Sequence, residues 1–166
     1  MGPSPNGSLS YRSLGLHVLL VDDSPVERLS LHVLLVDDNS LCRAMMSIVL
    51  QNLGLLVTCV NDGNNAVAAL QKRDFDVVLM DVEMPGTDGL AATVEIRQRE
   101  AQLNKYTPIV ALTSTTDRDR CFAAGMDGFV PKPLMPDDLE QIYRIVTNIR
   151  SELSAYTSER HESLPG

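Results

Sequence analysis

The sequence predicts an α/β fold, in which a doubly wound parallel sheet of five strands carries helices on both faces. From residue 31 onward, strand-length apolar runs alternate five times with segments whose apolar residues recur at helical spacing. Strands that are joined through helices need crossover connections, so they run parallel and are covered on both sides. Ligands of such sheets bind at the carboxyl ends of the strands.

The five strands are expected at residues 33–36, 56–60, 77–80, 109–112 and 128–130. The first helix begins after Asn39-Ser40, a favourable capping pair. Its apolar face is predicted to consist of Leu41, Ala44, Met45, Ile48, Val49 and Leu53, with Met45 in the core. This face, with the Met45-Met46 pair, is expected to pack on the sheet at one edge and to contact a partner at the other.

The remaining helices follow the same alternation. The second carries Ala66, Val67, Ala69 and Leu70, and the third carries Leu90, Val94 and Ile96. A short helix at 121–124 ends at Gly125. The last helix is capped by Asp137 or Asp138, and its predicted face is Leu139, Ile142, Tyr143, Val146, Ile149 and Leu153.

Composition narrows the classes of partner. The 166 residues carry a net charge of −8, which disfavours nucleic acids and anionic membranes because both bind clustered Lys and Arg. No apolar run is long enough to span a membrane, and no signal peptide is recognisable at the start. We expect a cytoplasmic protein, or a nuclear one if the source is eukaryotic, that binds neither nucleic acid nor membrane.

An eight-residue sequence occurs twice near the start of the chain. Residues 16–23 and 31–38 both read LHVLLVDD. The second copy fits the central strand, because using the first would place 15 surplus residues in the first crossover. We therefore expect a flexible leader at 1–15, a duplicated first-strand segment at 16–30, a folded domain at 31–150 and a C-terminal tail at 151–166.

Polar residues follow several of the predicted strands. Asp37 and Asp38 follow the first strand, Asp81 the third, and Thr113 the fourth; Lys132 follows the fifth. Three carboxylates at neighbouring strand ends repel one another unless a cation lies among them, and oxygen ligands favour Mg²⁺. The sequence therefore predicts a magnesium site.

The same residues can support phosphoryl transfer. Lys132 and the Thr113 hydroxyl can bind the outer oxygens of a phosphoryl group. One carboxylate can then act as the nucleophile, and Asp81 is the best placed because it ends the central strand.

These motifs resemble the receiver domain of two-component response regulators over roughly residues 31–150. The resemblance rests on the acidic pair at 37–38, the block MDVEMPGTDG at 80–89, the stretch VALTS at 110–114, and Lys132-Pro133. It implies a flavodoxin-like sheet of order 2-1-3-4-5. It also implies that Asp81 accepts phosphate from a phosphohistidine on a histidine kinase or a histidine phosphotransfer protein.

The resemblance assigns further roles. Asp37, Asp38, Asp81 and the backbone carbonyl of Glu83 would bind Mg²⁺. Thr113 and Lys132 would contact the phosphoryl group, and the Lys132–Pro133 peptide bond would be cis. Phe129 occupies the position of an aromatic switch, with no hydroxyl to form a hydrogen bond.

The predicted function is therefore a signalling phosphoacceptor that catalyses only its own phosphorylation and dephosphorylation, and that acts on an unknown downstream protein through the surface around Phe129. Two alternatives stay open. A phosphatase of the haloacid dehalogenase type also uses a nucleophilic Asp, Mg²⁺ and Lys, but it needs an Asp where Glu83 stands. The other is a receiver-like interaction module that works without phosphate.

Overall fold

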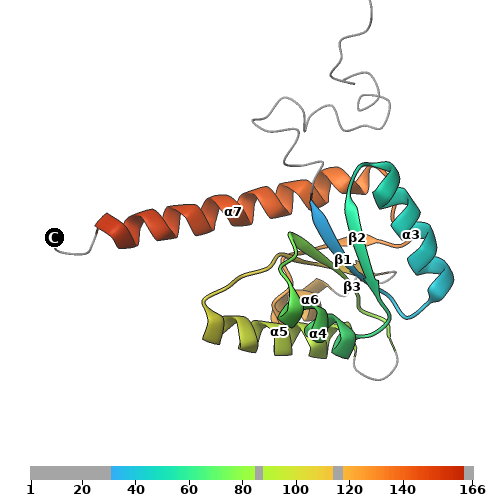
Figure 1. Cartoon of the computed structure of the whole chain (residues 1–166), viewed down its shortest axis with the longest axis horizontal. Coiled ribbons are helices and arrows are strands. Elements are labelled where there is room, and N and C mark those ends of the chain that lie inside the picture. Colours follow the sequence, from blue (N-terminus) through green and yellow to red (C-terminus); the bar gives the residue numbers. More distant parts are fainter. Residues whose placement is uncertain (1–30, 85–87, 114–117, 163–166) are drawn as a thin grey trace, which may run out of the picture.

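The computed structural model describes residues 31–84, 88–113 and 118–162. These residues fold into one five-stranded parallel sheet with helices on both faces (Figure 1). The strand order is β2-β1-β3-β4-β5, as predicted. Every neighbouring pair of strands is parallel. The strands are β1 (His32–Val36), β2 (Leu56–Val60), β3 (Val77–Asp81), β4 (Ile109–Thr113) and β5 (Gly128–Pro131).

A helix follows each strand, and short polar side chains fix where three of these helices begin. The helices are α3 (Ser40–Asn52), α4 (Gly63–Lys72), α5 (Gly89–Leu103), α6 (Arg118–Ala124) and α7 (Asp138–Glu162). Asn39, Asp62 and Asp88 each accept a hydrogen bond from the backbone N–H three residues later. These bonds satisfy N–H groups that have no partner inside the helix.

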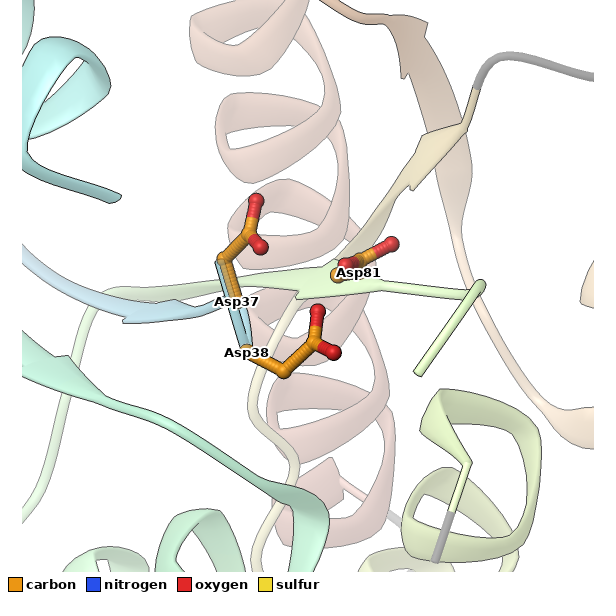
Figure 2. Close-up of side chains that lie close together, drawn as sticks. All are labelled: Asp37, Asp38 and Asp81. Atoms are coloured by element: carbon orange, nitrogen blue, oxygen red, sulfur yellow. The ribbon is translucent and has the colours of Figure 1, made fainter. Parts of the chain in front are cut away.

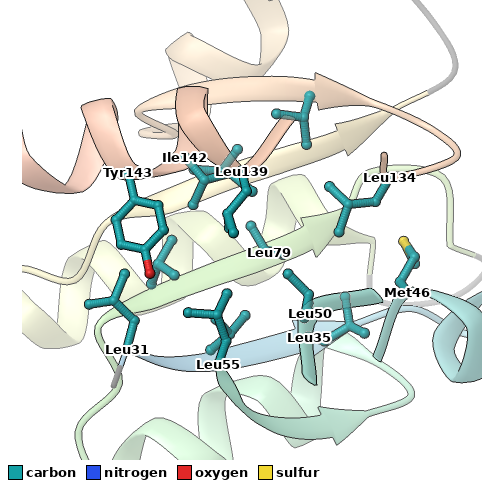
Figure 3. Close-up of a cluster of buried hydrophobic side chains, with 14 of the residues drawn as sticks. Leu31, Leu35, Met46, Leu50, Leu55, Leu79, Leu134, Leu139, Ile142 and Tyr143 are labelled. Carbon is teal, nitrogen blue, oxygen red and sulfur yellow. The ribbon is translucent and has the colours of Figure 1, made fainter. Parts of the chain in front are cut away.

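The two faces of the sheet build two separate cores. Side chains alternate along a strand, so Val33 and Leu35 enter one core while Leu34 and Val36 enter the other. Helices α3 and α7 cover the first core, which Figure 3 shows with Leu79 at its centre. Helices α4, α5 and α6 cover the second. Strands buried on both sides explain the continuous apolar runs of the sequence.

The face predicted for the first helix is correct for Leu53, which is buried, and for Val49, which packs against the core, but wrong for the other large apolar residues. Met46 and Leu50 are the buried residues of α3, whereas Leu41, Met45 and Ile48 are more than half exposed. Met45 is therefore not a core residue. The helix carries two adjacent apolar stripes, and spacing alone does not distinguish the stripe that packs on the sheet from the stripe beside it.

The face predicted for α7 is correct only in its first half. Leu139, Ile142, Tyr143 and Val146 are buried, but Leu153 is 41% exposed. Arg150 pairs with Asp76, and the helix then continues beyond the sheet to Glu162 (Figure 1). The boundary proposed at residue 150 therefore falls inside a continuous helix.

The second copy of the duplicated sequence forms β1, which lies between β2 and β3. The predicted leader and the first copy, at 1–30, lie outside the described residues. Among the helices of the described part of the chain, none is long and apolar enough to cross a membrane.

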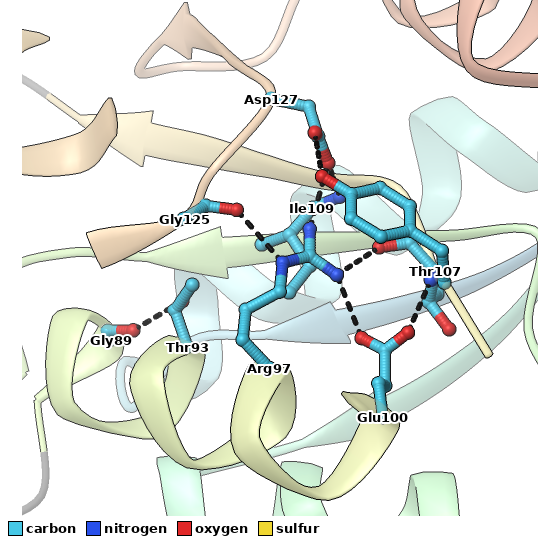
Figure 4. Close-up of polar contacts among 9 residues, drawn as sticks. Gly89, Thr93, Arg97, Glu100, Thr107, Ile109, Gly125 and Asp127 are labelled. Carbon is cyan, nitrogen blue, oxygen red and sulfur yellow. Dashed lines mark hydrogen bonds and ion pairs between the residues drawn. The ribbon is translucent and has the colours of Figure 1, made fainter. Parts of the chain in front are cut away.

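Arg97 on α5 joins two loops at the amino-terminal edge of the sheet, the one before β4 and the one before β5 (Figure 4). Its guanidinium donates to the carbonyls of Gly125 and Thr107 and pairs with Glu100 and Asp127. Burial raises the pKa of Glu100, although Arg97 opposes the shift. Gly125 has φ +107° and packs against the Arg97 side chain, so a side chain there would be strained and would clash.

Two leucines on α7 provide a test of this packing. Leu139 is 1% exposed and Leu153 is 41% exposed. We expect Leu139→Ala to lower the free energy of unfolding by about 2–5 kcal/mol, because it removes apolar contacts and leaves a cavity. Leu153→Ala is the matched control and should change it by less than ~0.5 kcal/mol. Urea denaturation measures both, and equal losses would contradict the packing of α7.

Candidate functional site

The carboxyl ends of the two central strands bring the three predicted aspartates together (Figure 2). Val36 pairs with Met80 across β1 and β3, so Asp37 and Asp81 come next on neighbouring strands. One carboxylate oxygen from each of Asp37, Asp38 and Asp81 lies within 4.8 Å of the other two. The parallel register therefore produces the cluster.

The three aspartates differ in their exposure. Asp37 is 0% exposed and Asp81 is 1% exposed, whereas Asp38 faces solvent. Two carboxylates thus form the floor of the site, and the third stands at its rim. Burying a carboxylate is costly unless a cation or hydrogen-bond donors compensate for the lost water.

Lys132 supplies the cation. Its Nζ lies 2.9 Å from Asp81 Oδ2 and 3.1 Å from Asp37 Oδ2. Its backbone N–H donates to the carbonyl of Thr113, which ties the chain after β5 to the end of β4. The Lys132–Pro133 peptide bond is cis.

The protonation of these groups follows from burial and pairing. Burial raises the pKa of Asp81, although the hydrogen bonds from Lys132 and from the backbone of Glu83 oppose the shift. Burial alone would lower the pKa of Lys132, but Asp81 and Asp37 outweigh it and raise the pKa. Lys132 therefore stays charged at neutral pH.

Backbone groups hold the two buried carboxylates from outside the cluster. The N–H of Asn39 donates to Asp37 Oδ1, and the N–H of Glu83 donates to Asp81 Oδ1, both at 2.9 Å. Gly89 lets α5 begin against β3, because a Cβ there would lie 2.1 Å from the Asp81 carbonyl oxygen. A side chain at residue 89 would therefore push α5 away from the end of β3.

Oxygen donors at this spacing fit a hard divalent cation. Asp37 Oδ2 is buried and lies 3.1 Å from Lys132 Nζ, and among the described residues it accepts no well-aligned hydrogen bond. Together with the carboxylates of Asp38 and Asp81, this oxygen can serve as a Mg²⁺ ligand.

Residues 33–144 match the family model described as the response regulator receiver domain. The chain belongs to the receiver domain family. The chain spans only about a seventh of the length of the two curated relatives described next. Sensor protein GacS of Pseudomonas syringae pv. syringae is 39% identical over 129 residues, which cover 75% of this chain and 13% of that protein. Probable histidine kinase 6 of Oryza sativa subsp. japonica is 34% identical over 156 residues, which cover 82% of this chain and 14% of that protein.

Solved receiver structures share the fold. The receiver domain of sensor histidine kinase PA1611 from Pseudomonas aeruginosa PAO1 has a magnesium ion in its active-site cleft. It is 36% identical and has a TM-score of 0.63, covering 71% of this chain and 98% of that one. Chemotaxis protein CheY4 of Vibrio cholerae is 35% identical and has a TM-score of 0.63. The match covers 70% of this chain and 98% of the CheY4 chain. These matches favour a receiver over a haloacid dehalogenase.

The remaining predicted residues surround the cluster in this receiver. Thr113 is buried at the end of β4, and Glu83 is exposed two residues after Asp81. Phe129 is half-buried on β5 and contacts the ring of Phe122 edge-on. Arg118 lies over the Phe129 ring, 4.2 Å from its centre. Ser114 lies outside the described residues.

An apolar groove lies beside the receiver's acidic cluster, and the sequence predicted a partner contact on its α3 side but not its second wall, the segment after β5. Its walls are α3 and the segment after β5, and Lys132 lies at its end nearest the carboxylates. Met45, Ile48 and Met135 line it, and each is 56% exposed. The sequence feature that indicates this groove is the second apolar stripe of the first helix, because the core needs only one apolar stripe.

The metal site predicts a stability effect that depends on Mg²⁺. A ligand that binds only the folded state adds about 2.7 kcal/mol at ~100 times its dissociation constant. We expect saturating Mg²⁺ to raise the Tm of the wild type and to leave that of Asp37→Asn nearly unchanged, because this variant lacks a ligand oxygen.

Glu95→Gln is the matched control, since it also removes one carboxylate but lies on α5 in an exposed pair with Arg99. Differential scanning calorimetry with and without Mg²⁺ measures all three proteins. Equal Mg²⁺ shifts in all of them would rule out the aspartate cluster as the metal site.

Proposed function

We propose that this receiver accepts a phosphoryl group on Asp81 from a phosphohistidine, with Mg²⁺ bound by Asp37, Asp38, Asp81 and the backbone carbonyl of Glu83. One observation carries the proposal. Asp81 is buried at the end of the central strand, and Lys132 and two further carboxylates lie within reach of its side chain. A nucleophile, a fixed cation and a metal site therefore converge on one position.

The reaction is an in-line displacement at phosphorus. A carboxylate oxygen of Asp81 forms the new P–O bond while the P–N bond to the donor imidazole breaks, and the imidazole nitrogen retains the electron pair of that bond. Lys132 Nζ and the Thr113 hydroxyl bind oxygens of the transferred group. The bound cation supplies charge neutralisation for the attacking and transferred oxygens.

The backbone contacts of the site support this role for Asp81. The N–H of Glu83 donates a hydrogen bond to Asp81 Oδ1, whereas Asp81 Oδ2 faces Lys132. Reaction at the oxygen on the Lys132 side leaves the first hydrogen bond intact. The carboxylate therefore needs little reorientation, which lowers the cost of reaching the transition state.

The apolar groove suits the donor protein. We propose that an amphipathic helix carrying the phosphohistidine lies along α3, with its apolar face against Met45, Ile48 and Met135. Methionine side chains adapt their shape, so one groove can accept donors of different sequence. A histidine kinase or a histidine phosphotransfer protein fits this description.

The response is proposed to pass through Phe129 and α6 to a downstream protein. Phe129 lies between Phe122 and Arg118 and is joined to Lys132 by two residues of chain. We propose that engagement of Thr113 with a phosphoryl group is coupled to a change in the packing of this ring, as the family resemblance implies. Phe129 has no hydroxyl, so only its packing changes in this mechanism.

We also propose a leader at 1–15, the duplicated segment at 16–30 and residues 31–150 as the receiver unit, with the tail at 151–166 beginning inside α7 as its continuation beyond the sheet. A cytoplasmic location, or a nuclear one in a eukaryote, agrees with the charge balance. The chain would catalyse only its own phosphorylation and dephosphorylation.

Intact mass after incubation with Mg²⁺ and acetyl phosphate tests the phosphoacceptor. We expect one added phosphoryl group on the wild type and none on Asp81→Asn or without Mg²⁺. Asp88→Asn is the matched control, because Asp88 caps α5 and should leave labelling unchanged. The chain beginning at residue 31 is run in parallel to remove the duplicated segment.

The outcomes separate the alternatives. Multiple-turnover hydrolysis of a phosphate monoester such as p-nitrophenyl phosphate would favour a phosphatase, whereas a receiver that only labels and unlabels itself with acetyl phosphate should leave the monoester intact. Absence of any adduct, in the full and the shortened chain alike, would favour an interaction module that works without phosphate.

The groove makes a separate prediction about donor proteins. We expect Met45→Glu to slow transfer from a phosphorylated histidine phosphotransfer protein by at least about tenfold, which corresponds to about 1.4 kcal/mol, because a carboxylate would enter an apolar contact. Labelling by acetyl phosphate should not change. Leu103→Glu, an equally exposed change on α5, is the control. Equal rates for both variants would exclude the groove as the docking site.

A further inference from the structure

Arg43 contacts the backbone that connects two of the proposed metal ligands. It lies in the first turn of α3, and its Nη1 donates to the carbonyl oxygen of Asp37 at 2.7 Å. That carbonyl belongs to the peptide unit between Asp37 and Asp38. Because a peptide unit is planar, fixing the direction of its C=O also fixes the direction of the following N–H and the start of Asp38.

Asp37 is held on its other sides by different groups. Its N–H donates to the carbonyl of Val60 on β2, and its Oδ1 accepts from Asn39. These bonds hold Asp37 and the start of α3 at Asn39, on either side of Asp38. Arg43 adds a direct hydrogen bond to the carbonyl of the Asp37–Asp38 peptide. Asp38 is exposed at the rim, so packing does not hold its backbone in place.

Helix stability does not explain an arginine at this position. The amino end of a helix carries partial positive charge, so a cation in the first turn is unfavourable. The first turn of α3 contains no acidic residue that could compensate. Three carboxylates lie nearby, but among the described residues no ion pair with Arg43 is found, and its contact is to a backbone carbonyl.

We propose that Arg43 is a positioning residue for the metal site: by holding the Asp37–Asp38 peptide, it orients Asp38 toward the cation bound by Asp37 and Asp81. This inference rests on the proposed Mg²⁺ site. Groups that orient metal ligands in this way typically change metal affinity by about 10–100-fold when they are removed.

Charge and geometry predict opposite effects, which makes the proposal testable. If Arg43 acted only through its charge, neutralising it would strengthen Mg²⁺ binding, because one cation would no longer repel another. If it positions Asp38, neutralising it weakens binding. Arg43→Met removes the charge and the donor at similar length, whereas Arg43→Lys keeps a charge and one donor group.

Isothermal titration with Mg²⁺ on the full chain measures the affinity. We expect Arg43→Met to bind Mg²⁺ about 10–100-fold more weakly than the wild type. The loss of affinity should be smaller in Arg43→Lys, which keeps a donor group. Arg99→Met, which removes an exposed arginine from α5, should match the wild type. Unchanged or tighter binding in Arg43→Met would overturn the proposal.

Amide hydrogen exchange in the metal-free protein gives a second readout. The N–H groups of Asp38 and Asn39 should exchange faster in Arg43→Met than in the wild type, while the amides of β3 should not change. Exchange that stays the same at residues 38 and 39 would also overturn the proposal. Failure of the wild type to bind Mg²⁺ would contradict the proposed function, and exchange would then decide the role of Arg43 alone.

Discussion

The mutual repulsion of buried carboxylates at one edge of the sheet is the constraint on which the rest of the site depends. Asp37 and Asp81 are brought together by the register of β1 and β3, and neither reaches solvent. Lys132 offsets part of this charge from the end of β5. The pairing of β5 with β4 and the hydrogen bond from the Lys132 N–H to the Thr113 carbonyl place that lysine beside the two aspartates.

The two-sided core explains why this edge can carry so much charge. Apolar side chains fill both faces of β1, β3 and β4, so the body of the domain needs no polar contact near the cluster. The larger polar network lies at the opposite edge, where Arg97 joins Glu100 and Asp127 (Figure 4). The loops at the amino-terminal edge therefore stabilise the fold, and the loops at the carboxyl-terminal edge present the reactive groups.

Much of the fold was predictable because buried parallel strands and helices differ in length and in periodicity. The strand order came from the family resemblance rather than from periodicity. The aspartates and Lys132 were predictable because chain position alone places them at strand ends. The orientation of α3 was not, since Leu41, Met45 and Ile48 form a stripe as apolar as the buried one. Arg43 was missed because a contact from a side chain to a backbone carbonyl leaves no pattern in a sequence.

The direction of α7 has a practical consequence. The helix starts beside the acidic edge, passes Asp76 just before β3, and leaves the domain at the amino-terminal edge (Figure 1). A fluorescent protein or an affinity tag fused after the last residue would thus be carried away from the aspartates and from the groove along α3. Reporter fusions at the carboxyl terminus are therefore compatible with access of other proteins to the reactive edge, whereas an insertion between β5 and α7 would obstruct it.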